Sequence, residues 1–460
     1  MNELEKLAEF TCSLKIRDVP FEVRETAVLR ILDLVGVAVG ASQNPLLKKI
    51  RNTYISLAEQ GFRVSIWGGD RSSLLTSVFL NAMSGHFLEL DDVHIKSKTH
   101  IGTVVVPAAW ALTEYLGKSG EDLVLAVVCG YETMSRIGAA LGVSSHRNKG
   151  WHVTSTAGTF GAAAACAKLL GLSVDQTISA LGMAGTQSFG LWAFLESGAN
   201  SKTLHPARAS VSGCEAAWLA KSGMIGPNKI LDADDGGLLR AMSDEPSLEQ
   251  VSKDLGKTWQ IKYMDNKPYP CCRSTHCAID AALTLQKNNN IPTDQIESIE
   301  VGTYLVGNKQ CGVSDTSRNP QTPVHAKFST PYTVACALMN GSVSLDDFTP
   351  AAISRTDVRT LLRKVSVVTE DKYTKMYPDH WGCRVVIHDA FGQTWETEIL
   401  DASGSVNKPL TTEQIIIKTE NLIKPVFPGQ YSDIVNKVLS ITSQKRLPEL
   451  AITTDRDEKK

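Results

Sequence analysis

The chain has 460 residues, of which 43 % are hydrophobic and 21 % are charged, so its length and composition indicate a globular protein of two or three domains. The formal net charge of −2 gives no reason to expect nucleic acid or an anionic membrane as a partner, so any anion-binding site must be local. Ten cysteines are too dilute for a disulfide scaffold, and most lie in apolar stretches, which favours reduced, buried thiols in a cytoplasmic protein.

The first half of the chain has an almost wholly helical pattern. Residues 1–6 are charged and lack the apolar core of a signal peptide, and no window has the roughly 18 to 20 uninterrupted apolar residues that span a bilayer. From Leu4 to about Leu255, apolar residues recur at helical spacing, and glycines such as Gly117 stand where several segments end. We predict helices over residues 21–39, 74–88, 104–116, 123–141, 154–170, 174–183 and 207–221.

A dense cluster of acids and bases fills segment 89–102, between two of the predicted helices. It holds three carboxylates, two imidazoles and two ammonium groups, which belong to Glu89, Asp91, Asp92, His94, His100, Lys96 and Lys98. Acids and bases held at the junction of two rigid elements suit proton-transfer chemistry. The alternative is a solvated polar loop that only joins two helices.

The pattern changes at about residue 265. A predicted helix at 278–286 is followed by a strand at 296–304, a polar loop to Pro323, helices at 331–339 and after Thr356, and strands at 365–368, 383–388 and 393–399. Residues 408–447 return to a helical pattern, with Thr411 or Thr412 as N-cap. We therefore expect a mainly α protein: a large all-helical domain, 1–265 with 402–460 returning to it, and a smaller α+β lid domain, 266–401.

Basic side chains stand at four predicted helix starts. His100 and His152 each precede a helix, Lys202 and His205 precede the helix that opens at residue 206, and His276 opens the helix at 277. A helix N-terminus carries free N–H groups and a partial positive charge, so a nearby His or Lys strengthens its attraction for carboxylate or phosphate. Four such positions with the acidic cluster indicate one pocket for a compound with several carboxylates, although each histidine taken alone is more often a satisfied core residue.

Metal and nucleotide sites fit the sequence less well. The Cys271-Cys272-x4-Cys277 group with His276 offers soft ligands and segment 91–94 offers hard ones, but neither has the two separated ligand pairs of a structural zinc site. No Gly-x-Gly-x-x-Gly motif follows a predicted strand and opens a helix. We expect no metal and no cofactor.

Several motifs in order resemble the MmgE/PrpD family, over nearly the whole chain. They are Leu90-Asp-Asp-Val-His with His100-Ile-Gly and Pro107-Ala-Ala, Gly150-Trp-His-Val-Thr-Ser-Thr with Gly158-Thr-Phe-Gly-Ala-Ala, Ser201-Lys-Thr-Leu-His, Lys267-Pro-Tyr-Pro-Cys-Cys-Arg-Ser-Thr-His, and Ala326-Lys-Phe-Ser. The family includes 2-methylcitrate dehydratase, cis-aconitate decarboxylase and iminodisuccinate epimerase.

The resemblance implies a cofactor-free homodimer whose active site lies between a large helical domain and a smaller lid. By position, His100, His152, Lys202 and His276 fall on the family's pocket residues, and Lys267 falls on a lysine near the domain junction. The acidic cluster falls on the family's Asp-rich loop.

The chain also departs from the family pattern at the site. Glu89 stands where several lyases of the family have the shorter Asp, Val93 replaces a threonine, and Ile101 replaces a proline. Val211 occupies a family arginine position, with Arg208 one turn earlier as a substitute. Loss of a hydroxyl donor and a moved guanidinium change how carboxylates are held, and Val93 argues slightly against decarboxylation without selecting among the other reactions.

The reactions of the family share one step, the movement of a proton at a carbon next to a carboxylate, which needs a tuned base and cations for the developing charge. We expect the catalytic groups to be His100 or His152 as acid or base, oriented by Asp91 and Asp92, with Lys202 and the lid residue His276. The substrate-binding residues are expected to be Glu89, His94, His205, Arg208, Lys267 and Arg273. The hypotheses are a lyase acting on a di- or tricarboxylic acid, an epimerase, and a non-catalytic carboxylate-binding protein.

Overall fold

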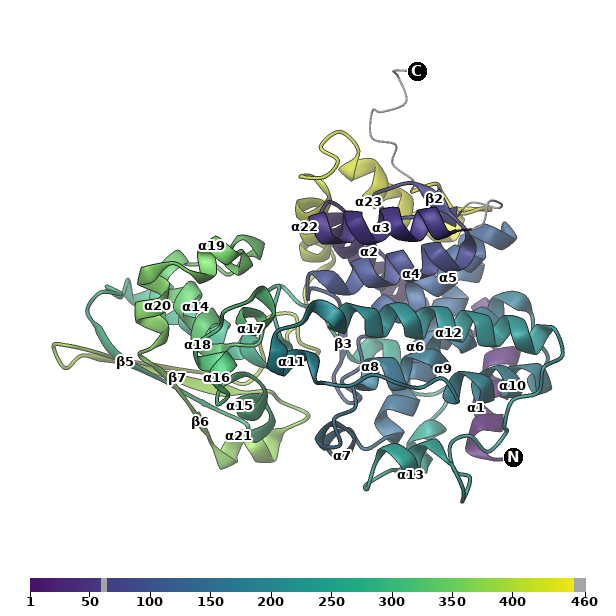
Figure 1. Cartoon of the computed structure of the whole chain (residues 1–460), viewed down its shortest axis with the longest axis horizontal. Helices are drawn as coiled ribbons and strands as arrows, with labels where there is room; N and C mark the ends of the chain where they lie inside the picture. The colour runs from purple at the N-terminus through teal and green to yellow at the C-terminus, as the bar shows by residue number, and fades with distance from the viewer. Residues whose placement is uncertain (59–63, 451–460) are drawn as a thin grey trace.

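The protein consists of a large helical part and a smaller part built around a β-sheet (Figure 1). The computed structural model describes residues 1–58 and 64–450, so residues 59–63 and 451–460 of the predicted helical domain lie outside it. One hydrophobic core contains buried residues from Leu4 to Met264 and again from Ile415 to Leu450, and a second contains residues from Cys271 to Ala402. The mainly helical class is confirmed, whereas movement of the smaller part as a lid stays a prediction.

The large part contains all seven helices that the hydrophobic spacing predicts. They correspond to α2 (Phe21–Ala41), α4 (Leu74–Phe87), α5 (Gly102–Leu116), α6 (Gly120–Ala140), α8 (Val153–Thr156) with α9 (Gly158–Leu170), α10 (Val174–Gly185) and α12 (Leu204–Lys221). Five further helices in the described residues were not predicted: α1 (Glu3–Ser13), α3 (Pro45–Leu57), α7 (Val143–Asn148), α11 (Phe194–Ser197) and α13 (Leu238–Met242). The predicted helix 154–170 is divided at Ala157 into α8 and α9. Gly117 has a left-handed backbone at the end of α5, as predicted.

Helix α9 lies in the middle of the large part, where α5, α6, α10 and α12 pack against it. Its neighbours come very close. A Cβ on Gly161 would lie 2.7 Å from Met134 Cβ of α6, and one on Gly213 of α12 would lie 2.4 Å from the carbonyl oxygen of Thr159. Glycine at these two crossings therefore allows the backbones to approach closely. In the described part of the chain, α6 is the one helix long and apolar enough to span a membrane, and 89 % of its most apolar window is buried, as in a core helix.

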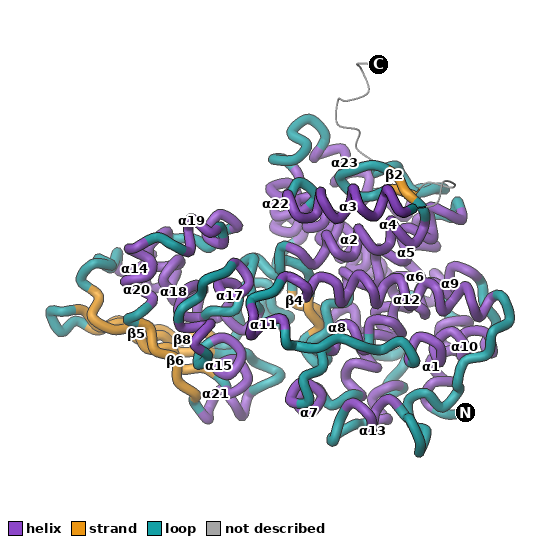
Figure 2. Tube along the Cα trace, viewed as in Figure 1, coloured by secondary structure: helices purple, strands orange, loops and turns teal. Residues whose placement is uncertain are grey.

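The smaller part has a four-stranded sheet, shown in orange in Figure 2. The strands β5 (Ile296–Thr303), β6 (Val365–Thr369), β7 (Cys383–Asp389) and β8 (Thr394–Ile399) lie in the order β6-β5-β7-β8, with β5 and β6 parallel and the other neighbours antiparallel. Helix α14 packs on β7 and β8, and α18 packs on β6. The helices are α14 (His276–Asn289), α15 (Leu305–Cys311), α16 (Asp315–Arg318), α17 (Pro323–Lys327), α18 (Thr330–Asn340), α19 (Pro350–Ile353), α20 (Thr356–Leu362) and α21 (Asp371–Met376).

Two features of the fold differ from the sequence-based expectation. The predicted loop up to Pro323 contains α15 and α16, which are too short for a periodic pattern to reveal. The acidic segment contains strand β3 (Val93–His94), which pairs with β4 (Met264–Asp265), and a further short pair joins β1 (Val64–Ser65) to β2 (Arg71–Ser72). Pairing of β3 with β4 ties the acidic segment to the junction of the two parts.

The C-terminal segment packs on the large part, with Thr411 as N-cap of α22 (Thr412–Ile423), followed by α23 (Tyr431–Leu439). Helix α22 packs on α2. Lys418 of α22 pairs with Asp33 of α2 at 2.7 Å and donates a hydrogen bond of 2.8 Å to the carbonyl oxygen of Leu90. Helix α22 therefore helps to fix the position of the acidic segment 89–102.

Candidate active site

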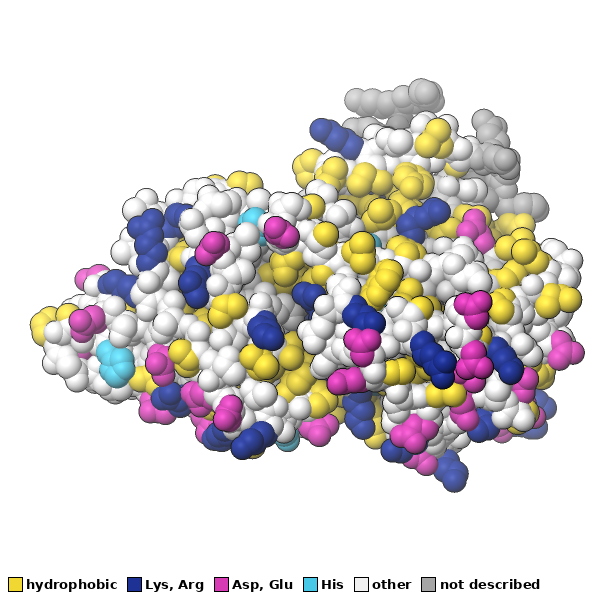
Figure 3. Space-filling view, turned by 60° about the horizontal axis from the view of Figure 1, so that its bottom comes forward, with side chains coloured by type: hydrophobic (Ala, Val, Ile, Leu, Met, Phe, Trp, Pro, Cys, Tyr) yellow, Lys and Arg dark blue, Asp and Glu magenta, His cyan; other side chains and the backbone are white. Residues whose placement is uncertain are grey.

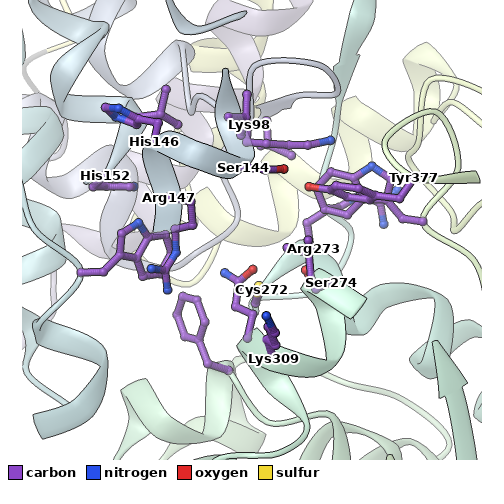
Figure 4. Close-up of a pocket in the computed structure, with 18 of the residues that line it drawn as sticks. Lys98, Ser144, His146, Arg147, His152, Cys272, Arg273, Ser274, Lys309 and Tyr377 are labelled. Carbon is purple, nitrogen blue, oxygen red and sulfur yellow. The ribbon is translucent and has the colours of Figure 1, made fainter. Parts of the chain in front are cut away.

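A cavity of about 590 Å³ opens where the two parts of the protein meet. Figure 4 shows His152 and Arg147 on one side of it and Lys98 and Tyr377 on the opposite side. Among the described residues that line it, six are lysine or arginine and only Glu89 is an acid. On the face shown in Figure 3, by contrast, basic and acidic side chains are interspersed.

Glu89 lies between two lysines at the wall of the cavity. Its carboxylate contacts Lys202 Nζ through Oε1 and accepts a hydrogen bond of 3.2 Å from Lys267 Nζ through Oε2. Burial raises the pKa of Glu89, but the charges of Lys202 and Lys267 outweigh burial and hold it well below the ordinary value. The residue has φ 59°, a left-handed backbone that is uncommon for glutamate, and its carboxylate points into this pair of ammonium groups.

Asp91 lies behind the cavity and contacts two imidazoles. Its Oδ2 is 2.6 Å from Nδ1 of His86 and 3.1 Å from Nδ1 of His100. Both contacts use Nδ1, so Nε2 of His100 is the nitrogen left to exchange a proton with a bound molecule. Burial lowers the pKa of His100 to about 4 in spite of Asp91, so this imidazole is neutral near pH 7. A neutral imidazole held by a carboxylate is the arrangement of a general base.

His152 is a second imidazole at the cavity, just before α8. Its Nδ1 is 2.8 Å from Nδ1 of His205, and its ring centre is 5.3 Å from that of Trp192. Burial, with the nearby charges of His205 and Lys202, holds the pKa of His152 well below its ordinary value. His152 is therefore also neutral and can accept a proton.

Two further cations reach the cavity wall near the junction. Arg273, the first residue of the short 3₁₀ helix η5 (Arg273–Thr275), donates from Nε to Asp265 at 2.7 Å, while its buried Nη1 has no hydrogen-bond partner among the described residues. Lys98 has φ 60°, and its ammonium lies 4.6 Å from the ring centre of Tyr377 and 4.1 Å from that of Trp381. Burial holds the pKa of Lys98 well below its ordinary value. Arg273 Nη1 is thus free to donate to an anion.

Six of the predicted site residues do not line the cavity. They are Asp91, which lies behind it, and Asp92, His94, His205, Arg208 and His276. Asp92 accepts hydrogen bonds from Tyr131 at 2.7 Å and from the amide of Gly102 at 3.0 Å, so it fixes the start of α5. His205 does not line the cavity itself but contacts His152, which does.

The other three residues have different surroundings. His94 is buried, with its Nδ1 2.9 Å from Ser97 Oγ. Arg208 is exposed on α12 and so cannot replace the missing family arginine at the cavity. His276 opens α14 as predicted, but it is buried with Nε2 3.3 Å from the carbonyl oxygen of Cys271 and packs on Tyr269, so a molecule in the cavity does not reach it.

Several residues of the site were not anticipated from the sequence. His86 does not line the cavity and, in the last turn of an apolar helix, gives no signal of its own, yet it contacts Asp91 and lies 3.8 Å from Glu89. The unanticipated lining residues come from elements that are distant in the sequence, and they include Arg147, Trp192, Lys309, Phe328, Tyr377 and Trp381. Only the three-dimensional packing brings them together.

One group of side chains in the described residues has the spacing of metal ligands. Ligand atoms of His86, Asp91 and His100 all lie within 4.8 Å of one another. The Nδ1 atoms of both imidazoles already face the Asp91 carboxylate: that of His86 is hydrogen-bonded to it, and that of His100 lies 3.1 Å from it. This group differs from the two that the sequence offered, at 91–94 and at Cys271–Cys277; all ten cysteines are free thiols.

Two family models match the chain. The MmgE/PrpD N-terminal domain matches residues 5–251, and the MmgE/PrpD C-terminal domain matches residues 269–440. The gap between the two matches contains β4 and Lys267.

Curated relatives match along most of their length. A cis-aconitate decarboxylase-like protein, oryM, of Aspergillus oryzae is 30 % identical over 98 % of this chain and 96 % of its own. The cis-aconitate decarboxylase of Aspergillus terreus is 26 % identical over 98 % of this chain and 93 % of its own, and that of Mus musculus is 27 % identical over 89 % and 84 %.

Proposed function

The chain belongs to the MmgE/PrpD family, and from that premise we propose that it is a cofactor-independent lyase acting on a small di- or tricarboxylic acid. The observation that carries the proposal is a neutral imidazole, His100, held by Asp91 at the wall of a cavity that is otherwise rich in cations. Such a site binds a polyanion and moves one of its protons.

The substrate carboxylates would bind where positive charge remains available. Lys202 and Lys267 share one carboxylate, Glu89, so the three groups together keep one net positive charge beside His100. Arg273 adds a buried Nη1 donor from the smaller part. When a proton leaves the carbon next to a carboxylate, negative charge moves onto that carboxylate as an enolate, and these cations stabilise it.

His100 would take that proton on Nε2 while Nδ1 stays toward Asp91. Removing the proton and expelling a hydroxyl group from the adjacent carbon completes a dehydration, and the electron pair of the broken C–H bond forms the new double bond. A bound polycarboxylate raises the pKa of His100, because negative charge favours the imidazolium. The same residue can then return its proton to the leaving hydroxyl.

Dehydration and decarboxylation differ in the protonation state that His100 must have when the reaction begins. Proton abstraction needs the neutral imidazole, which is the form that burial of His100 favours. Decarboxylation instead loses CO2 first, and the electron pair left behind must then be protonated. The names of the relatives favour a cis-aconitate-type decarboxylation, whereas the neutral His100 and the aliphatic Val93 favour a reaction that begins with a base.

The second candidate is an epimerase. His100 and His152 are both neutral and both line the cavity, so one could remove a proton and the other return it on the opposite face. Such a reaction changes the configuration of a carbon without changing the mass of the compound.

The test is incubation of the purified protein in heavy water with 2-methylcitrate, citrate, cis-aconitate and iminodisuccinate, followed by NMR. Loss of water or of CO2 supports the lyase and distinguishes its two forms, and deuterium incorporation without a new product supports the epimerase. Thermal stabilisation by these acids with no exchange of any hydrogen would indicate a non-catalytic carboxylate-binding protein instead.

We further propose a homodimer located in the cytoplasm, with neither nucleic acid nor membrane as partner. The support is the family resemblance and the near-neutral net charge. Sedimentation velocity on the purified chain tests the dimer.

A further inference from the structure

The wall of the cavity beside the catalytic groups is aromatic and aliphatic. The ring centre of Trp192 lies 5.3 Å from that of His152 and 6.2 Å from that of Phe328. The Phe328 ring centre in turn lies 5.2 Å from Lys202 Nζ. Trp192, Phe328 and Val93 all line the cavity, so apolar surface borders the place where a carboxylate would meet Lys202.

Apolar side chains also line the cavity from the smaller part. Leu305 and Val306 open α15, directly after the end of β5, and both face the cavity. Leu305 is 40 % exposed. A single exposed leucine is ordinary, but this one shares a cavity with Trp192, Phe328 and Val93.

The cavity is also larger than a compact acid requires. About 590 Å³ lies within the range of sites that hold drug-sized ligands, which is roughly 300 to 1,000 Å³. A small di- or tricarboxylic acid bound at Lys202, Lys267 and His100 would leave much of the aromatic wall in contact with water. Filling that surface with apolar atoms is favourable.

From these contacts we propose that the substrate is a carboxylic acid with an apolar side chain of several carbons next to the reacting carbon, and that Trp192, Phe328 and Leu305 hold this chain. The inference rests on the proposed function, because that function defines which carbon of the substrate reacts. The binding that it predicts can be measured without turnover. The carboxylates would lie toward Lys202 and Lys267, and the chain would lie along the aromatic wall.

Two cations near this wall could instead bind a charged group at the far end of the substrate, which is the alternative to an apolar chain. The guanidinium carbon of Arg147 lies 4.1 Å from the ring centre of Trp192, and Lys309 lines the cavity from α15. Arg147 covers one face of Trp192 with its own flat group, which leaves the apolar character of the wall in place. A chain ending in a carboxylate would pair with these cations, and a purely apolar chain would not.

Calorimetric titration with acids that do not react tests the proposal. The probes are succinate, methylsuccinate, butylsuccinate and octylsuccinate, and an analogue of butylsuccinate whose alkyl chain carries a carboxylate at its far end. Each buried methylene should tighten binding by about fourfold, so Kd should fall at least about tenfold from methyl to butyl. A Kd that is flat or rises beyond methyl overturns the proposal, as does failure of the whole series to bind. If the terminal carboxylate tightens binding further, the substrate is an extended polyanion and the apolar assignment is wrong.

Two variants and a matched control locate the chain. Leu305→Ser and Trp192→Gln should each reduce the ratio of the methyl to the butyl Kd toward one. Leu345→Ser should keep the wild-type ratio, because Leu345 is similarly exposed at 37 % and opens the 3₁₀ helix η6 (Leu345–Phe348) away from the cavity. Equal ratios in all three variants would place the chain elsewhere and overturn the proposal.

The outcomes for binding and for turnover are separable. If longer chains bind more tightly but no acid of any length is converted or exchanges a proton, the proposed function is wrong and the binding assignment stands. If short acids are converted and chain length has no effect on Kd, the inference is wrong and the proposed function stands.

Discussion

Asp91 is the residue whose replacement tests the proposed proton transfer most directly, because it touches the catalytic imidazole and does not line the cavity. Asp91→Asn keeps the size of the side chain and removes its charge. The Oδ2 atom of Asp91 lies close to Nδ1 of both His86 and His100, and Oδ1 is buried without a hydrogen-bond partner among the described residues. An amide nitrogen at the Oδ1 position would therefore be an unpaired buried donor.

The size of the effect follows from these two contacts. A hydrogen bond to a charged group contributes about 1.5 to 3 kcal/mol and one between neutral groups about 0.5 to 1.5 kcal/mol. Replacing the Asp91–His86 hydrogen bond of the first kind by one of the second costs about 1 to 1.5 kcal/mol. Loss of the charge contact with His100 at 3.1 Å costs at least a similar amount, so the hold on the imidazoles weakens by about 2 to 3 kcal/mol. If all of that loss appears in the transition state, kcat falls about 30- to 150-fold, and further if the amide turns its NH2 group toward His100.

The assay is kcat and KM for the substrate found by NMR, measured from pH 5 to 8. Asp91 raises the pKa of His100, so in the variant this pKa falls below about 4 and no new acid limb should appear in kcat/KM above pH 5. Asp357→Asn is the control, because Asp357 is exposed and pairs with Arg355 at 2.7 Å on the surface of α20. A folded Asp91→Asn variant that retains more than half of the wild-type kcat would refute the role of Asp91 in positioning His100.

Three further predictions concern the same site. His152→Ala should lower kcat by about two to four orders of magnitude if this imidazole transfers a proton, and near-full activity in a folded variant would exclude it. Lys202→Ala should mainly raise KM, because it removes a carboxylate ligand beside Glu89; an unchanged KM and kcat would remove Lys202 from the site. The free energy of unfolding, measured with urea at pH 7, 6 and 5, should fall as the pH falls from about 6.5 toward 4. Buried histidines with a lowered pKa stay neutral in the folded protein over this range and bind protons only when the chain unfolds, so acid favours the unfolded state. They include His94, His100, His146 and His205. Asp92 and Glu132 have raised pKa values and act in the opposite direction, but the histidines outnumber them. Constant stability over that range would contradict these protonation states.

The main helices and the positions of the long strands along the chain could be predicted from the sequence because both depend on local periodicity. The spacing of apolar residues indicated α2, α4, α5 and α6 at nearly their observed bounds, and Thr411 caps α22 as its position suggested. The importance of Glu89 and His100 was also visible, because charged groups so dense between two apolar helices are hard to explain as packing.

The sequence could not show which polar side chains share a surface. His276 and His152 look alike as basic residues at helix starts, yet His152 faces the cavity and His276 packs on Tyr269. The direction of each side chain depends on the orientation of its helix relative to the others, and that orientation is set by packing between distant segments.

The sequence by itself therefore determined the mainly helical fold class, the family, and a segment of acidic and basic residues suited to proton transfer. Tertiary structure alone decided that β3 pairs with β4, that Glu89 lies between Lys202 and Lys267, and that Asp91 contacts His86 as well as His100. The reason is physical: local periodicity records which residues prefer burial, while the contacts of a buried charge depend on backbone path and packing. For Glu89 the partners Lys202 and Lys267 are more than a hundred residues away, and only the packed core brings them near.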